Sequence, residues 1–315
     1  MEILEVNSTI YDESIKTFSL FTKASFALLN NNKVEKLYFL LFKDSKVRLG
    51  IILGLRQGQL FSPFSAPYGG FSFVKLDCKA KIIDNAILIL NEWIINKRYL
   101  KVIIGLPPLH FNNQFQTRLI NGLRNNSFKI QQLNVNHHFQ IPSGRFEDSY
   151  SKMLQSNAKK NLKNSFKNEL KFIQLEKQDF KRAYNIIAIN RAVKQKPLKM
   201  SLEQIMEITS LTKVDSFVVM NQNQDVASAI VFHLSKEVVQ VIYWGDNPSF
   251  SEMRSMNFLS FELFKYYKSA GIRTVDVGIS TENSIPNYGL CEFKESIGCE
   301  ISLKYLMSKD FFYKE

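Results

Sequence analysis

The sequence predicts an α+β protein in which two halves of similar architecture follow each other. Three strands, a helix and a fourth strand recur in the same order, and the apolar pattern of each element supports its assignment. Corresponding early strands lie about 179 residues apart, and the later elements lie about 173 apart. We interpret this as a duplication in which each half is a mixed, mostly antiparallel sheet flanked by helices.

The first half comprises residues 1–144. Apolar runs predict strands at 37–42, 47–55, 59–64 and 101–106. A helix is predicted between the last two strands. Asp84 is placed to cap it, and Ile87, Leu90 and Ile94 form an apolar stripe on one face.

The second half, residues 145–315, repeats the pattern. Strands are predicted at 216–220, 226–234, 239–245 and 273–279, with a helix over 255–270 before the last of them. Gly271 stands where a left-handed residue ends a helix. The boundary between the halves is expected near Pro142 to Gly144, where a strand stops and a new helix begins.

That new helix, expected over 147–167, has two sides. Phe146, Tyr150, Leu154, Ala158, Leu162 and Phe166 line one side, and Lys152, Lys159, Lys163 and Lys167 line the other. The lysines form either a cationic ridge that binds a ligand or an ordinary solvated face.

Positive charge is concentrated around this helix. The chain has a net charge of +12, and residues 145–199 hold 14 basic and 5 acidic residues, so this segment supplies +9 of it. Such a field suits a phosphate-bearing ligand, an anionic lipid headgroup or nucleic acid, although lysine-rich surfaces also serve solubility.

Several classes of protein are disfavoured. No apolar run approaches the length of a membrane span, and the N-terminus lacks the features of a secretory signal. Three cysteines do not make a disulfide framework, so we expect a cytoplasmic protein, with the inner face of the membrane as a second location. There is no P-loop and no G-x-G-x-x-G motif.

The sequence also predicts no metal site. The four histidines are His110, His137, His138 and His233, and none lies at ligand spacing to a cysteine. His137 and His138 are neighbours on an expected strand and so point to opposite faces. Cys291 and Cys299 are expected to pack in the core.

Polar groups gather at the carboxyl ends of the second-half strands. Tyr243 and Trp244 end one strand, and Asp276 and Ser280 end its expected parallel neighbour. Asp276 lies between two valines, so its burial requires hydrogen-bonding partners. It either takes part in the chemistry of the site or holds the following loop in place. Lys294, between Phe293 and Ile297, is expected to be held against the sheet, where an ammonium stabilises a phosphate or an oxyanion. A surface lysine is the alternative.

These residues carry a family likeness. The stretch YWGDNPSFSEMRSMNFLSFELFKYYKSAGIRTVDVGIS, followed by NYGLCEFKESIGCE, resembles the C-terminal half of the Fem-type aminoacyltransferases, which are built from two tandem GNAT-like domains. The helix QSNAKKNLKNSFKNELKF and the loop LFSPFSAPYGGFSF are similar to further parts of that family. The resemblance covers most of the chain and is strongest over 150–306.

The resemblance implies a set of site residues. Lys294, Asp276 and Tyr243 would be catalytic, with no metal involved. The residues implied in substrate binding are Lys159, Lys160, Arg191, Arg254, Trp244, Ser280, Tyr288 and Tyr68.

The donor is left open. PSFSEMRSM lacks the glycine-rich turn with which ordinary GNAT enzymes hold the coenzyme A pyrophosphate, although Arg254 there offers a charge. A long coiled-coil arm, which accompanies some members that engage aminoacyl-tRNA, is not evident either. The donor is therefore acyl-CoA or aminoacyl-tRNA, used as a co-substrate, and no tightly bound cofactor is expected.

Together these features favour transfer of an acyl or aminoacyl group to an amine of a phosphate-bearing acceptor, either a small molecule or lipid-linked. The expected acceptors are cell-envelope precursors of the peptidoglycan or amino-sugar type. The alternative is a non-catalytic module of the same fold that binds tRNA or an anionic surface.

Overall fold

The computed structural model describes residues 1–15, 19–75 and 78–313, which divide into two compact units. Unit 1 comprises Met1–Val135, Thr281–Ile285 and Ser302–Glu315, and unit 2 comprises Asn136–Ser280 and Pro286–Ile301. The predicted halves, 1–144 and 145–315, are continuous in sequence, whereas these units are not, because the end of the chain belongs to unit 1.

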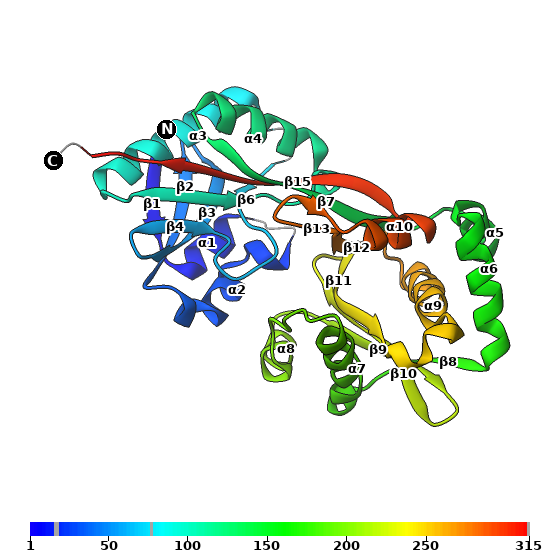
Figure 1. The fold of residues 1–315 in the computed structure, drawn as a ribbon. Helices are drawn as coiled ribbons and strands as arrows, with labels where there is room; N and C mark the ends of the chain where they lie inside the picture. The colour runs from blue at the N-terminus through cyan, green and yellow to red at the C-terminus, as the bar shows by residue number, and fades with distance from the viewer. Residues whose placement is uncertain (16–18, 76–77, 314–315) are drawn as a thin grey trace. The chain divides into compact units, whose positions relative to one another are not determined.

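The elements of the two units can be followed along the chain in Figure 1. Unit 1 contains β1 (Glu2–Val6), α1 (Ser8–Ser14), α2 (Ala24–Leu29), β2 (Lys36–Lys43), β3 (Val47–Arg56), β4 (Gln59–Ser62), β5 (Phe71–Phe73), α3 (Ala80–Asn96), β6 (Lys101–Gly105), α4 (Asn113–Asn125) and β13 (Thr281–Glu282). Unit 2 contains α5 (Phe146–Met153), α6 (Ser156–Ser165), β8 (Leu170–Gln174), α7 (Phe180–Val193), α8 (Leu202–Ile208), β9 (Val214–Asn221), β10 (Gln224–His233), β11 (Val238–Asp246), α9 (Ser255–Ser269), β12 (Thr274–Ile279) and α10 (Tyr288–Ser296). Three strands have residues in both units: β7 (Lys129–Gln140), β14 (Ile285–Pro286) and β15 (Glu300–Asp310).

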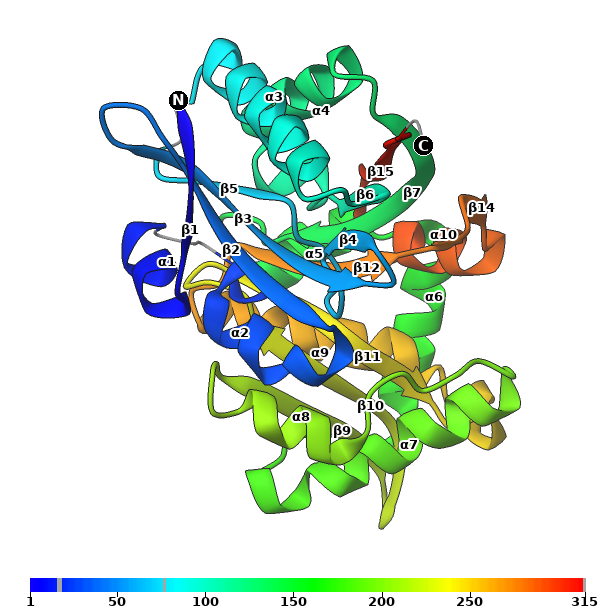
Figure 2. The same cartoon turned by 90° about the vertical axis from the view of Figure 1, so that its left-hand side faces the viewer.

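In unit 1, helices cover both faces of the sheet, as Figure 2 shows. The strand order is β1-β2-β3-β4-β6-β15, with β5 beside β3. Side chains of β2 alternate between the faces: Leu40 and Phe42 pack with α3 and α4, whereas Phe39 and Leu41 pack with α1 and α2. This explains why residues 37–42 are almost entirely apolar.

Unit 2 repeats the run of three antiparallel strands followed by a helix and a parallel strand, here β9, β10, β11, α9 and β12. Its strand order is β7-β12-β11-β10-β9-β8, and α9 packs on one face of the sheet through Leu259, Leu263 and Tyr267. In both units a helix links two parallel strands, β4 to β6 and β11 to β12, while the remaining pairings described are antiparallel. The predicted α+β class, with a mixed and mostly antiparallel sheet in each half, is confirmed.

The last strand of each half of the sequence pairs with a strand of the other half. Residues Asn136–Gln140 of β7 run antiparallel to β12 in unit 2. Residues Leu306–Asp310 of β15 run antiparallel to β6 in unit 1. The two halves of the sequence thus exchange their final strands.

Two predicted helix features were wrong. The helix expected over 147–167 is divided into α5 and α6, because Leu154 is extended and the backbone N–H of Gln155 donates to Ser296 O at 3.0 Å. Phe166, expected on the apolar side, follows α6 and is 52% exposed. The helix thought to begin at Asp84 begins instead at Ala80, although its predicted face of Ile87, Leu90 and Ile94 is fully buried.

A buried carboxylate ties together several elements of unit 2. Asp215 of β9 is 2% exposed and accepts hydrogen bonds from Tyr267 Oη at 3.0 Å and Gln174 Nε2 at 3.1 Å. His233 Nε2 lies 2.6 Å from the same carboxylate, and Lys213 Nζ lies 3.1 Å from it. Burial raises the pKa of Asp215, but the contacts with His233 and Lys213 outweigh it and leave the pKa lowered.

Gly245, near the end of β11, packs closely against α7. A Cβ atom there would lie 2.8 Å from Cγ of Asn190, whose amide donates to Asp246 O at 2.7 Å. We expect Gly245→Ala to lower the free energy of unfolding by about 1–3 kcal/mol, because the added methyl group has no space. Urea denaturation measures this.

The matched control is Gly289→Ala in α10, where the nearest atom to the new Cβ is 4.0 Å away. That variant should be unchanged or slightly more stable, since alanine favours a helix. Equal stability of the Gly245 variant and the parent protein would contradict the predicted clash.

No helix formed by residues 1–15, 19–75 and 78–313 combines the length and apolarity that crossing a membrane requires.

Candidate functional site

The candidate site of unit 2 is built where β11 and β12 part. The two strands pair in parallel over three positions, ending with Gln240 opposite Asp276. Both continue beyond that point, β11 to Asp246 and β12 to Ile279. Polar side chains of β7, β11, β12 and α10 meet there.

Asp276 is completely buried and has the hydrogen-bonding partners that the sequence required. Its Oδ1 accepts from Asn136 Nδ2 at 2.8 Å and from the Gly278 backbone N–H at 2.9 Å, and its Oδ2 accepts from Gln240 Nε2 at 2.8 Å. The carboxylate therefore holds β7, β11 and the end of β12 together.

The backbone at the end of β12 is irregular, and two of its carbonyl groups bind Lys294. The β12–β7 register shifts between Asp276 and Gly278, and Gly278 has a φ of +74°, a conformation that favours glycine. The carbonyl groups of Gly278 and Ile279 accept hydrogen bonds from Lys294 Nζ at 2.9 and 3.1 Å.

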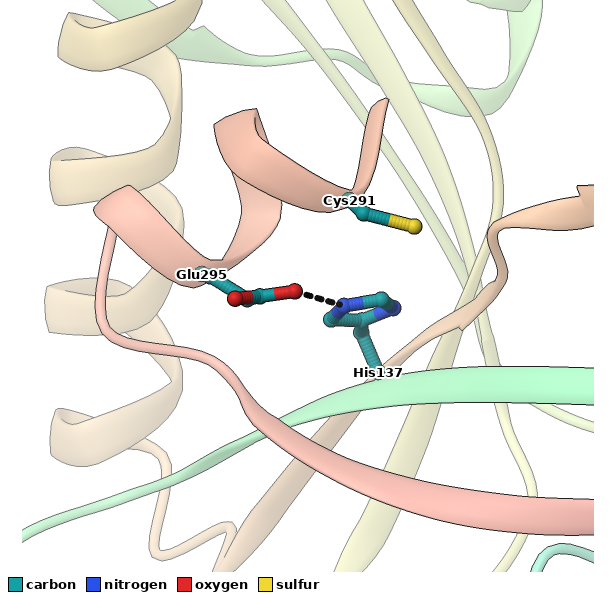
Figure 3. Close-up of side chains that lie close together, drawn as sticks. All are labelled: His137, Cys291 and Glu295. Carbon is teal, nitrogen blue, oxygen red and sulfur yellow. Dashed lines mark ion pairs between the residues drawn. The ribbon is translucent and has the colours of Figure 1, made fainter. Parts of the chain in front are cut away.

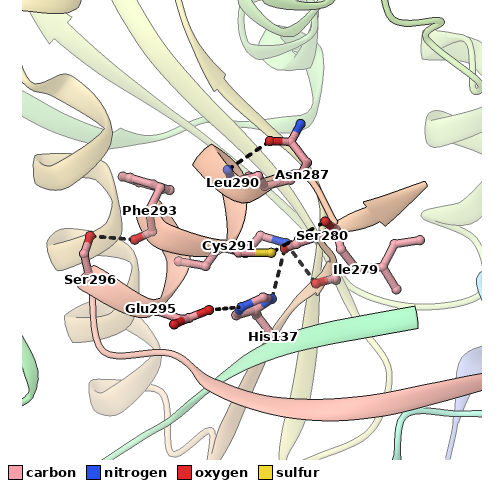
Figure 4. Close-up of polar contacts among 11 residues, drawn as sticks. His137, Ile279, Ser280, Asn287, Leu290, Cys291, Phe293, Glu295 and Ser296 are labelled. Atoms are coloured by element: carbon pink, nitrogen blue, oxygen red, sulfur yellow. Dashed lines mark hydrogen bonds and ion pairs between the residues drawn. The ribbon is translucent and has the colours of Figure 1, made fainter. Parts of the chain in front are cut away.

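Lys294 is held against the sheet, as the sequence predicts. The side chain is 2% exposed. Burial lowers the pKa of Lys294 to about 8, although Cys299 and Asp276 oppose that shift. The helix that carries it, α10, is capped by Asn287, whose side chain accepts the Leu290 N–H at 3.1 Å (Figure 4).

Three further side chains, two from α10 and one from β7, lie close together. His137 of β7, Cys291 and Glu295 each have a potential ligand atom, and these atoms all lie within 4.8 Å of one another (Figure 3). His137 Nε2 is 3.5 Å from Glu295 Oε1, and His137 Nδ1 is 2.9 Å from Ser280 Oγ. Burial and the nearby Lys294 ammonium lower the pKa of His137.

This cluster is not evident in the sequence. Cys291 and Glu295 lie four residues apart and so share a helix face, which is a weak signal. His137 comes from a strand 154 residues earlier, and only the fold brings it to α10. Cys291 is half-buried rather than part of the apolar core, whereas Cys299 is buried as predicted.

Tyr243 and Trp244 of β11 contact other parts of unit 2. The Tyr243 hydroxyl accepts the Met200 N–H at 3.1 Å, and the Arg191 guanidinium lies 5.6 Å from the centre of its ring. Burial raises the pKa of Tyr243, so the hydroxyl stays protonated at neutral pH. Trp244 packs edge-on against Phe293, with 6.0 Å between ring centroids.

The other predicted site residues are more dispersed. Lys159 and Lys160 are exposed on α6, and Lys159 lines a groove of about 270 Å³ between α5 and α6. Arg254, exposed and left-handed, precedes α9, and Tyr288 is 73% exposed. Tyr68 belongs to unit 1, where it is buried and its hydroxyl lies 2.6 Å from Ser19 Oγ.

Comparisons with known proteins identify the fold. No family model matches the sequence, and no curated protein matches it. A crystal structure of FemX, however, matches 99% of this chain and 98% of that one, with a TM-score of 0.71 at 11% identity. A tandem GNAT protein from the clavulanic acid biosynthesis pathway matches 89% of this chain and 84% of its own, with a TM-score of 0.50 at 6% identity. The chain has a Fem-type, GNAT-like fold.

This Fem-type fold also occurs in L-PGS from Bacillus licheniformis. That structure matches 95% of this chain and 90% of its own, with a TM-score of 0.61 at 12% identity. The architecture expected from the sequence motifs is thus confirmed. At these identities the likeness establishes the fold.

Proposed function

We propose that the protein transfers an acyl or aminoacyl group from an activated ester or thioester to an amine of a phosphate-bearing cell-envelope precursor. The observation that carries this proposal is the Lys294 ammonium, buried at the point where β11 and β12 part. An ammonium has three N–H donors, and two of them bind the carbonyl groups of Gly278 and Ile279. In this proposal the third donates to the ligand.

Such a donor suits acyl transfer. When the neutral amine attacks the carbonyl carbon, the carbonyl oxygen becomes an oxyanion, and a fixed positive charge stabilises that oxyanion most where water is excluded. Collapse of this intermediate breaks the ester or thioester bond and expels the alcohol or thiol of the donor, which takes up the proton that the amine loses. Holding amine and carbonyl together supplies much of the remaining rate enhancement. In this scheme Lys294 is the catalytic residue, and it acts as a cation.

Asp276 and Tyr243 have different roles in the scheme. Asp276 is a positioning residue, because its contacts with Asn136, Gln240 and Gly278 fix the strands that present the carbonyl groups to Lys294. The protonated Tyr243 hydroxyl, already accepting the Met200 N–H, keeps a proton to donate to an oxygen of the acceptor and so orients the acceptor while the amine lone pair stays free.

The basic face of α6 supports a phosphate-bearing acceptor. We expect the pair Lys159→Glu and Lys160→Glu to raise KM for the acceptor several-fold while kcat changes little, because charges that bind substrate and transition state equally affect mainly KM. Steady-state kinetics with varied acceptor measure this.

The matched control is the pair Lys177→Glu and Lys181→Glu. These lysines are also exposed, and the pair changes the net charge equally. If both pairs of substitutions raise KM equally, the change in net charge causes the rise. The assignment of Lys159 and Lys160 to acceptor binding is then wrong.

A matrix of donors and acceptors tests the proposal. Aminoacyl-tRNAs and acyl-CoA thioesters are each combined with nucleotide-linked and lipid-linked muropeptides and with amino-sugar nucleotides, and mass spectrometry detects acceptors heavier by one acyl group. Transfer with one pair supports the proposal. Failure of every pair, together with tRNA affinity that falls steeply with salt, would instead favour a binding module.

A further inference from the structure

The cluster of His137, Cys291 and Glu295 has no part in the proposed transfer chemistry. Cys291 and Glu295 project from one face of α10 toward His137 of β7, as Figure 3 shows. The three side chains thus offer an imidazole nitrogen, a thiol sulfur and a carboxylate oxygen within 4.8 Å of one another.

The imidazole of His137 is oriented as in metal sites. Its Nδ1 lies 2.9 Å from the hydroxyl of Ser280, which is itself buried, and Figure 4 shows this contact. Its Nε2 is buried, has no hydrogen-bond partner among the described residues and faces Glu295. A histidine that binds a metal through one nitrogen commonly has the other held by such a neighbour, which fixes the ring and its tautomer.

We propose that His137 Nε2, Cys291 Sγ and the Glu295 carboxylate bind one divalent metal ion, with Zn²⁺ as the preferred ion. Imidazole, thiolate and carboxylate are the ligands that zinc takes in proteins. Three protein ligands leave the fourth tetrahedral position to water.

The distances suit this assignment. Ligand bonds of about 2.0–2.3 Å in a tetrahedral zinc site place neighbouring ligand atoms roughly 3.3–3.8 Å apart. His137 Nε2 and Glu295 Oε1 are already 3.5 Å apart, and an imidazole nitrogen, the Cys291 sulfur and a carboxylate oxygen all lie within 4.8 Å of one another.

Charge and access are also suitable. Binding releases the thiol proton to solvent, so a thiolate and a carboxylate together neutralise the ion. This offsets the repulsion from Lys294, the residue next to Glu295. The Glu295 side chain is 38% exposed, and Cys291 is half-buried, so an ion can reach the cluster. Once bound, the ion would link α10 to β7 and so restrain the helix that carries Lys294.

Cobalt provides a direct test. Tag-free, chelator-treated protein is titrated with CoCl₂, and ZnCl₂ affinity is measured against a chromophoric chelator. We expect one ion per chain, a thiolate-to-cobalt charge-transfer absorption and a higher melting temperature with Zn²⁺. Cys291→Ser should abolish the charge-transfer band, and Cys291→Ser and Glu295→Gln should each weaken zinc binding by at least tenfold.

Glu292→Gln, an exposed glutamate on the same helix, and Cys78→Ala, a cysteine of unit 1, are the matched controls and should bind as the parent does. Zinc affinity that is unchanged in Cys291→Ser and Glu295→Gln, or no cobalt–thiolate band, would overturn the assignment. Because binding and spectra are measured without substrate, this result is independent of the proposed transferase activity.

Discussion

Replacing Lys294 by methionine should lower kcat for acyl transfer by about 10²–10³-fold, the loss seen when one donor to an oxyanion is removed. Methionine keeps much of the side-chain volume but has no charge and no N–H. The acceptor KM should change much less, because the interaction forms mainly in the transition state. Single-turnover rates with saturating donor and acceptor measure the chemical step.

The controls separate catalysis from folding. Lys294→Met leaves the Gly278 and Ile279 carbonyl groups without their donor, which costs about 1–3 kcal/mol, so rates are compared well below the melting temperature of each variant. Lys236→Met makes the same substitution at an exposed lysine in the β10–β11 hairpin and should retain full activity. An unchanged kcat in Lys294→Met would remove the central residue of the proposed mechanism.

The largest effect on stability should follow substitution of Asp215. Asp215→Ala removes the acceptor shared by His233, Tyr267 and Gln174, and the buried groups left behind lose their partners. We expect the free energy of unfolding to fall by about 3–5 kcal/mol. Urea unfolding in a Trp93→Phe background measures this through Trp244, then the sole tryptophan and a residue of unit 2.

The same carboxylate predicts a pH dependence. The pKa of Asp215 is lower in the folded chain than its usual value, so ionisation stabilises the fold above the unfolded pKa of about 4. That contribution should be lost as pH falls through the lower, folded pKa. In Asp215→Asn the free energy of unfolding should therefore fall less steeply at acid pH than in the parent protein. An equally steep fall would contradict the assignment.

The elements that the sequence predicted well are those whose own apolar pattern determines them. The face of Ile87, Leu90 and Ile94, the strands and the left-handed Gly271 (φ +75°) are local features, and the structure has each of them. The burial of Lys294 could be predicted because Phe293 and Ile297 surround it in sequence.

The features that escaped prediction depend on partners distant in sequence. The break at Leu154 is accompanied by a hydrogen bond from Gln155 to Ser296, about 140 residues away. The histidine of the proposed metal site lies 154 residues before Cys291. Nothing in the composition around His137 indicates that Cys291 and Glu295 will meet it.

The exchanged strands also constrain how the chain is made. β6 ends at Gly105, yet its neighbour β15 is not complete until Asp310, about 200 residues later. At about 5–20 residues per second, a ribosome needs roughly 10–40 s to synthesise that interval. During this time one edge of the nascent sheet has no strand beside it, so the newly made chain should depend on chaperones until β15 has been synthesised.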